Sequence, residues 1–284
     1  MSKPGPIRGR LGKKPFAVLN RSIPHTKMPS LKTPRLKKQI ASSSSFWRIS
    51  GKTLGQLCLP DFCPRCFWLR QNLAARRIKE PWQIFPGIFS SIDSYSKKII
   101  HGHFDTYGKP PPWLSELGDI VGYRPPPSAQ KFYTIDPDTN IQLTGAPDAI
   151  FELKDGSLMI GDYKTARYTK NQDALAPLYE GQLNAYHHIA KSLGWAQVTK
   201  LVLIYTEPVT DNLSSYCLSG SNSGFPLFFS TNSKNIPIYS DLIPNLLKRA
   251  SRILNSVFSL LPKTECSDCT ALNEIHLLKI QEVA

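Results

Sequence analysis

The sequence predicts an α/β fold in which helices flank a mixed central sheet. Two β-rich runs, 149–153 and 158–165, precede a helical segment, and a β-branched apolar run follows at 198–206. Strands that alternate with helices in this way indicate a mixed sheet with helices packed on it. The chain has 284 residues, of which 41% are hydrophobic, so it can bury one sizeable core. We therefore expect one main domain, at residues 46–284.

Residues 1–45 differ in composition from the rest of the chain. They hold eleven of the 35 Lys and Arg residues and no acid, so residues 46–284 carry 24 basic against 21 acidic residues, about +3 of the formal charge of +14. The segment is rich in Pro, Gly and Ser and has too few apolar residues to offset the entropy of ordering. We expect a disordered tail. Three roles stay open: a solvated tail without a specific role, an arm for DNA phosphates, or a targeting segment.

The apolar patterning excludes two classes of protein. No window approaches the roughly 18 to 20 apolar residues that a membrane span requires. The N-terminal segment also lacks the compact apolar stretch of a secretory signal. We therefore expect an intracellular, cytoplasmic protein, in which disulfides are not expected.

Helical spacing of apolar residues predicts three helices outside the β-rich part. The first lies around 67–77, and the second, 89–107, stops at the prolines of 109–112. The third is an amphipathic helix at 241–261. Before it, the glycines of 220–224 mark a loose loop.

The β-rich part begins after a proline-rich connector at 125–127. A strand near 131–135 comes first, and we expect it to complete a meander with the two β-rich runs. The segment Lys-Asp-Gly at 154–156 joins those runs and is typical of a hairpin turn.

The length of the hairpin loop decides which residues face each other. A two-residue turn ending at Gly156 pairs Asp148 with Tyr163 and puts the acids on opposite faces, whereas a three-residue loop with Gly156 in the left-handed region pairs Asp148 with Asp162. We favour the three-residue loop because it segregates apolar from charged side chains. One face then holds Phe151, Leu153, Met159 and Tyr163, and the other holds Asp148, Ile150, Ile160, Asp162 and Lys164.

The charged face has the residue types of a hydrolytic metal site. Asp162 and Lys164 are two apart on one strand, so they share a face. The carboxylates of Asp148 and Asp162 repel each other, and Mg²⁺ or Mn²⁺ would relieve this repulsion while activating a water for attack on phosphorus. Lys164 is placed to orient that water or to stabilise the developing charge. An isolated Asp and Lys spaced two apart more often lie on a surface hairpin, where their charges are merely solvated. The neighbouring segments therefore decide between the two interpretations.

The helix predicted at 177–193 supplies that context. It carries Gln182 and Tyr186 at i and i+4, so an amide and a phenol share one face where they can meet a phosphate or nucleotide. The other interpretation of this pair is a core-facing tyrosine beside an exposed glutamine. We interpret His187 and His188 on the same helix as surface or packing residues.

In this order, the segments GAPD, GDYKT and GQLNAY resemble the RecB-like branch of the PD-(D/E)xK nucleases. The resemblance covers roughly residues 56–270 and is most specific at 145–186. It implies a restriction-endonuclease-like core and a metal-dependent DNA nuclease, with exonuclease activity on single-stranded or free ends. The implied roles are metal ligands for Asp148, Asp162 and the Tyr163 carbonyl, the catalytic lysine for Lys164, and supporting substrate contacts for Gln182 and Tyr186.

Relatives usually place a further acid or histidine on an upstream helix. On the helix predicted at 89–107, Asp93, Lys97 and His101 lie at i, i+4 and i+8 and share one stripe. Asp93 is the first candidate for a further metal ligand, His101 is the second, and His103 stays open. The alternative is an exposed, charged stripe without a role.

Four of the six cysteines form two CxxC pairs, Cys63 with Cys66 and Cys266 with Cys269. Two such pairs at the ends of a domain offer four thiolates to one Zn²⁺ or to a [4Fe-4S] cluster, and ordinary buried thiols are the third interpretation. The resemblance points towards a cluster, because several RecB-like nucleases hold one with one early and three late cysteines. This chain departs from that pattern with two and two, and Cys58 and Cys217 are left over.

The leading hypothesis is an enzyme that cleaves DNA, and the intact Asp148, Asp162 and Lys164 favour it. One alternative is a non-catalytic DNA-binding or assembly module that kept the fold. Another is a structural subunit of a DNA repair or processing complex, for which the cysteine pairs alone would matter. The sequence has no Walker A motif, so any helicase activity must come from a partner.

Overall fold

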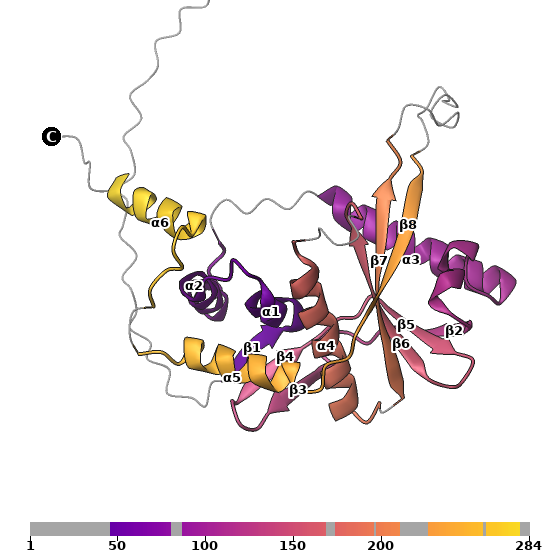
Figure 1. Ribbon diagram of the computed structural model, residues 1–284, viewed down its shortest axis with the longest axis horizontal. Helices are drawn as coiled ribbons and strands as arrows, with labels where there is room; N and C mark the ends of the chain where they lie inside the picture. The colour runs from indigo at the N-terminus through magenta and orange to yellow at the C-terminus, as the bar shows by residue number, and fades with distance from the viewer. Residues whose placement is uncertain are drawn as a thin grey trace, which may run out of the picture. The chain divides into compact units, whose positions relative to one another are not determined.

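The computed structural model describes residues 46–80, 87–168, 174–195, 197–210, 227–257 and 260–278 (Figure 1). The predicted tail at 1–45, the predicted loop at 220–224 and Cys217 lie outside the described residues, so those statements stay predictions. Within the described part, no helix combines the length and apolar character needed to cross a membrane.

A five-stranded mixed sheet forms the centre of the fold. In sheet order its strands are β2 (Ile120–Arg124), β5 (Ala149–Leu153), β6 (Leu158–Thr165), β7 (Val198–Pro208) and β8 (Phe229–Ile236). β6 and β7 run parallel, and the other neighbours run antiparallel. Helices lie on both faces, so the predicted α/β fold with a mixed, helix-flanked sheet is confirmed.

A second sheet of three strands stands beside the first. Its order is β1 (Trp47–Ser50), β4 (Ile141–Thr144) and β3 (Tyr133–Asp136). The predicted strand near 131–135 exists as β3, but the predicted meander is wrong, because β3 pairs with β4 and the free edge of β5 is taken by β2. Local turn chemistry explains this: the Asp136 carboxylate accepts hydrogen bonds from the N–H and hydroxyl of Thr139, and Asn140 adopts φ +53°, which closes a β3–β4 hairpin.

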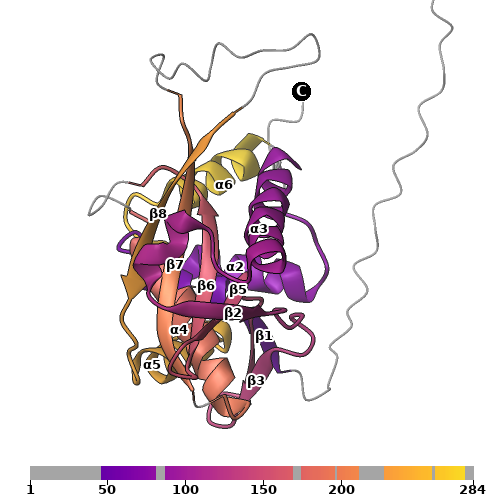
Figure 2. The same ribbon diagram turned by 90° about the vertical axis from the view of Figure 1, so that its right-hand side faces the viewer.

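The large sheet divides the core into two layers (Figures 1 and 2). On one face, Ile100 and Phe104 of α3 (Gly87–Tyr107) pack with Phe151, Met159 and other apolar residues of the sheet. On the other face, the core is completed by α4 (Ala176–Ser192) and α5 (Leu242–Leu254). Each layer buries one face of the β5–β6 hairpin, as the segregated pattern predicted.

The helix predicted at 241–261 is too long. α5 ends at Leu254 because Asn255 leaves the helix, where its side-chain oxygen accepts a hydrogen bond from the Trp47 indole and its amide donates to Ser251. A separate helix follows, α6 (Ser267–Leu278), which the sequence did not predict. The helix predicted around 67–77 is α2 (Pro64–Ala75).

A short helix, α1 (Gly51–Gly55), crosses α4 at two glycines. A Cβ on Gly55 would overlap the carbonyl oxygen of Leu178, and one on Gly181 would lie 2.8 Å from the Cα of Gly55. Only glycine permits this approach of backbone to backbone. The crossing fixes the part of α4 that carries Gln182.

Candidate active site

The β5–β6 hairpin has the register that the three-residue loop predicts. Ile150 pairs with Ile160, Gly156 has φ +82°, and continuation of the ladder puts Asp148 opposite Asp162. The side chain of Tyr163 is buried in the layer of α3. Asp162 and Lys164 contact α4 on the opposite face, so the predicted segregation is confirmed for these three residues. The Asp148 carboxylate, predicted on the face of Asp162, instead reaches Lys97 on α3, because Asp148 precedes the strand β5.

Asp162 is almost completely buried, with 2% of its surface exposed. Its Oδ1 accepts a hydrogen bond from Gln182 Nε2 at 3.0 Å, and its Oδ2 forms an ion pair with Lys164 Nζ. Burial raises the pKa of Asp162 to about 6, because the positive charge of Lys164 only partly offsets burial and the negative charge of Asp148 adds to it. A buried acid of this kind is typical of a functional site.

Gln182 connects the acid, the lysine and the tyrosine. Its amide group donates to Asp162 and, at 2.7 Å, to the hydroxyl of Tyr186, while its Oε1 accepts from Lys164 Nζ at 3.3 Å. Gln182 and Tyr186 are both buried, with 5% and 4% exposed. The ammonium of Lys164 also lies 4.4 Å from the ring centroid of Tyr179, a cation–π contact that was not predicted. The sequence could have indicated this contact, because Tyr179, Gln182 and Tyr186 at i, i+3 and i+7 lie on one face of the helix.

Asp148 precedes β5 and joins the other helix layer. Its Oδ2 accepts from the backbone N–H of Tyr163 at 3.0 Å, and its Oδ1 lies 2.8 Å from Lys97 Nζ on α3. The same Lys97 ammonium lies 2.9 Å from Asp93 Oδ2. Burial acts to lower the pKa of Lys97, but hydrogen bonds to Asp148 and Asp93 raise it overall. We had predicted Lys97 on the same helix stripe as Asp93, but we had assigned it no role.

Of the three upstream candidates, the structure brings Asp93 to Asp148, through Lys97. His101 instead stacks on Tyr123 with ring centroids 4.3 Å apart, and burial lowers its pKa. His103 lies with Nδ1 2.9 Å from the carbonyl oxygen of Lys109. His187 and His188 are partly buried on α4, where burial lowers the pKa of both.

The donor set of the site suits a hard cation. Three carboxylates and two ammonium groups meet here, which leaves one net negative charge among them. Side-chain exposure falls from 40% for Asp93 through 21% for Asp148 to 3% for Asp162, so solvent reaches the cluster from the side of α3. Carboxylate oxygens are the ligands that Mg²⁺ and Mn²⁺ prefer, so these residues offer donors of the type that such an ion takes.

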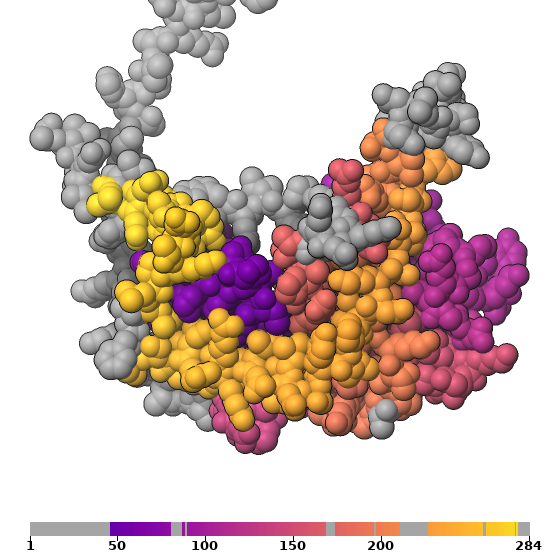
Figure 3. Space-filling model, viewed as in Figure 1, coloured from indigo at the N-terminus to yellow at the C-terminus, as the bar shows by residue number. Residues whose placement is uncertain are grey.

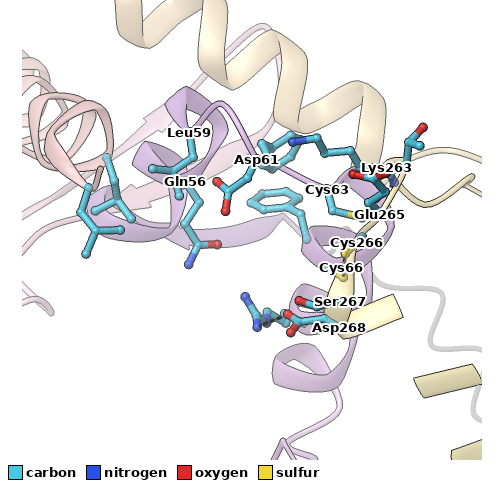
Figure 4. Close-up of a pocket in the computed structure, with 16 residues that line it drawn as sticks. Gln56, Leu59, Asp61, Cys63, Cys66, Lys263, Glu265, Cys266, Ser267 and Asp268 are labelled. Atoms are coloured by element: carbon cyan, nitrogen blue, oxygen red, sulfur yellow. Dashed lines mark hydrogen bonds and ion pairs between the residues drawn. The ribbon is translucent and has the colours of Figure 1, made fainter. Parts of the chain in front are cut away.

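The two CxxC pairs meet in space, as predicted. The ligand atoms of Cys63, Cys66, Cys266 and Cys269 all lie within 4.8 Å of one another, although their sequence positions are about 200 residues apart. A pocket of about 410 Å³ opens beside three of these thiols, which Figure 4 shows converging between α2 and the segment before α6. Cys58 lies elsewhere, against Gly181 of α4.

Comparison with known proteins identifies the family. No curated protein matches this chain. A solved structure described as "Crystal structure of SSO0001" aligns with 16% sequence identity and a TM-score of 0.40, over 75% of this chain and 79% of that chain. The family model described as the PD-(D/E)XK nuclease superfamily matches residues 109–273, a span of more than half of the chain that includes Asp148, Asp162, Lys164, Gln182 and Tyr186. The chain belongs to the PD-(D/E)XK nuclease superfamily.

Proposed function

We propose that this protein is a Mg²⁺- or Mn²⁺-dependent deoxyribonuclease that hydrolyses phosphodiester bonds, with RecB-like exonuclease activity on single-stranded or free ends. The observation that carries the proposal is the pairing of buried Asp162 with Lys164 beside Asp148. Superfamily membership suggests a nuclease, and the choice of DNA, of the metal and of free ends is our proposal.

Asp148, Asp162 and the backbone carbonyl of Tyr163 would hold the metal, with Asp93 as a further ligand at the solvent side. When bound, the metal supplies an activated water and neutralises charge on the phosphate. Lys97 already neutralises Asp93 and Asp148, so it must move aside or share those carboxylates when a metal binds. The two carboxylates and the one ammonium group on this side therefore set the affinity for the metal.

Lys164 would stabilise negative charge that develops on the phosphate in the transition state. Its ammonium is fixed by Asp162, Gln182 and the Tyr179 ring, so little reorganisation is needed when the charge forms. Because Gln182 and Tyr186 are buried, we propose that they act on the substrate through Asp162 and Lys164 rather than by exposed contacts.

The proposed partners are DNA and, because the chain has no Walker A motif, a helicase or another subunit of a repair complex. The eleven basic residues of 1–45 support a nucleic-acid substrate, since they can gain affinity for a phosphate backbone by releasing counterions. We also propose a cytoplasmic location, which the apolar patterning of the sequence led us to expect.

The test is cleavage of single-stranded DNA labelled at the 5′ or the 3′ end, with Mn²⁺, Mg²⁺ or EDTA, and of RNA of the same sequence. We expect metal-dependent release of short products from one end of the DNA, and loss of cleavage in Asp162→Asn. The matched control is Asp138→Asn, which changes an exposed acid in the β3–β4 turn. Full activity in Asp162→Asn, or equal activity in EDTA, would refute the proposed site.

A further inference from the structure

The α6 residues whose burial the structure describes bury almost no apolar surface against the rest of the protein. Among these described residues, only Cys269 is buried, and the neighbouring core cluster consists of Cys63, Cys66 and Cys269 with Cys266 packed against it. Thiols alone bury little apolar surface, so burial does not account for the position of α6.

Polar contacts do not hold α6 either. Arg70 pairs with Asp268 at 3.0 Å, but the two side chains are 40% and 56% exposed. Arg65 lies 3.5 Å from the side-chain oxygen of Asn273, also at the surface. Exposed pairs of this kind contribute little to stability. The four thiols are therefore the main link between α2 and α6, which lie together in the space-filling view (Figure 3).

The distances between the sulfurs match the ligand shell of a single ion. Cys66 Sγ lies 3.3 Å from Cys269 Sγ and 3.5 Å from Cys266 Sγ, and Cys63 Sγ lies 3.7 Å from Cys269 Sγ. Four thiolates at about 2.3 Å from one Zn²⁺ in a tetrahedron stand about 3.8 Å apart. A [4Fe-4S] cubane puts four iron atoms between the sulfurs and needs a wider spacing. The cysteines fit one ion and do not fit a cubane.

The local backbone is also built for thiolates. Cys63 is the N-cap of α2, Cys66 follows in its first turn, and Cys266 and Cys269 hold the same positions at the start of α6. Positive helix ends therefore point at the sulfurs from two sides. In addition, the backbone N–H of Lys263 donates to Cys63 Sγ at 3.4 Å. The pocket beside the thiols gives an ion a route of entry.

We propose that Cys63, Cys66, Cys266 and Cys269 bind a single structural Zn²⁺ that holds α6 to α2, and that this chain carries no iron–sulfur cluster. The site is independent of the proposed nuclease activity. Among the described residues, none of the four cysteines contacts the carboxylate of Asp148 or Asp162. Loss of the ion would release α6 and leave the central sheet in place.

The test is elemental analysis of the full chain, purified without oxygen and without chelators. We expect one zinc per chain, no iron, no acid-labile sulfide and no visible absorption. Exchange of zinc for Co²⁺ should then give the strong visible bands of a tetrahedral thiolate complex. Iron with sulfide, which gives brown protein, or the absence of any metal would overturn the proposal.

Three variants make the test specific. Cys269→Ser should lose the zinc, and its α6 should become sensitive to limited proteolysis. Cys58→Ser, which changes a cysteine outside the cluster, should keep one zinc per chain. Asp162→Asn should also keep the zinc, so a failed nuclease proposal and a failed zinc proposal give different results. Zinc retained by Cys269→Ser would exclude that residue as a ligand.

Discussion

The carboxylate cluster and the cysteine cluster are both candidate metal sites, but the rest of the protein supports them in different ways. Asp162 is held by Gln182 and Lys164 inside a core that extends over both faces of the hairpin. The cysteines form a small cluster of their own between α2 and an otherwise exposed α6. We therefore expect the carboxylate site to keep its shape without a metal, and the cysteine site to depend for its shape on the zinc ion that we propose.

Packing around the carboxylates shows how that shape is kept. A Cβ on Gly145 would lie 2.8 Å from the rings of both Phe132 and Tyr186, so the loop before Asp148 rests directly on α4. Tyr186 in turn accepts the second hydrogen bond of the Gln182 amide. The glycine of the GAPD segment and the tyrosine of the GQLNAY segment therefore belong to one packed unit, which connects two parts of the motif that are 41 residues apart in sequence.

The sharpest test of this comparison pairs Asp162→Asn with Cys269→Ser. Asp162→Asn should lower the cleavage rate by at least about 10²-fold, because it removes a ligand charge and the partner of Lys164. The melting temperature and the zinc content should stay close to those of the natural protein. Cys269→Ser should have the opposite pattern: it should lose the zinc, while its cleavage rate should fall by less than about tenfold, because the two sites are independent. The two sites are coupled if each variant impairs both properties.

Gln182→Leu tests whether the buried network positions the catalytic groups. The change keeps the apolar bulk but removes all three hydrogen bonds of the amide. We expect the turnover number to fall about 10- to 100-fold, as for other residues that orient metal ligands. KM for DNA should be nearly unchanged, because the side chain is buried. A raised KM with unchanged turnover would instead indicate direct contact with the substrate.

Gly181→Ala tests whether the α1–α4 crossing supports the carboxylate site. The added methyl group would meet the Cα of Gly55 at 2.8 Å, and a backbone cannot yield as a flexible side chain can. We expect a loss of about 1–3 kcal/mol of unfolding free energy, measured by denaturant titration. Gly156→Ala is the matched control. It strains the backbone, because Gly156 has φ +82°, but its added Cβ meets no atom within 4 Å, so it shows the effect of strain without a packing clash. Unchanged stability in Gly181→Ala would show that the crossing adapts.

Lys97→Met tests the charge balance of the carboxylate cluster. Removal of the ammonium leaves Asp93 and Asp148 without their shared cation, so the site becomes more negative and should bind Mn²⁺ about tenfold more tightly, by about 1.4 kcal/mol. Isothermal titration of the metal measures this without reference to activity. Lys97→Arg, which keeps the charge, should bind Mn²⁺ as the natural protein does. Weaker binding by Lys97→Met would mean that the lysine holds the carboxylates in position for the metal.

Local chemistry explains which parts of the fold were predictable from the sequence. β5 and β6 were predicted at the bounds observed, because Gly156 and the alternation of apolar residues specify one hairpin register. α4 was predicted within one residue at each end, since Pro177 and Gly194 mark its limits. Asp148, Asp162 and Lys164 were brought together for the same reason.

The parts that were missed depend on partners far away in sequence. β1 pairs with β4 about 94 residues later, and its alternation of apolar and polar residues, Trp47 to Ser50, is too short to indicate a strand without that partner. Among the α6 residues whose burial the structure describes, only Cys269 is buried, so α6 shows no buried apolar stripe of the kind that predicts a helix. The contact between Lys97 and Asp148 spans 51 residues and exists only because α3 packs on the sheet. Spacing within a segment cannot reveal such contacts.

Deletion of residues 1–45 should have the smallest effect on either site, because the ligands of both clusters lie between Cys63 and Cys269. We expect an unchanged melting temperature, zinc content and rate at saturating DNA. Affinity for DNA should fall, and its dependence on salt should become less steep, because eleven basic residues no longer displace counterions from the phosphates. Binding measured by fluorescence anisotropy between low and physiological salt gives the slope. A variant with the eleven basic residues changed to Gln separates charge from length, and an unchanged slope in both variants would leave the segment without a role in DNA binding.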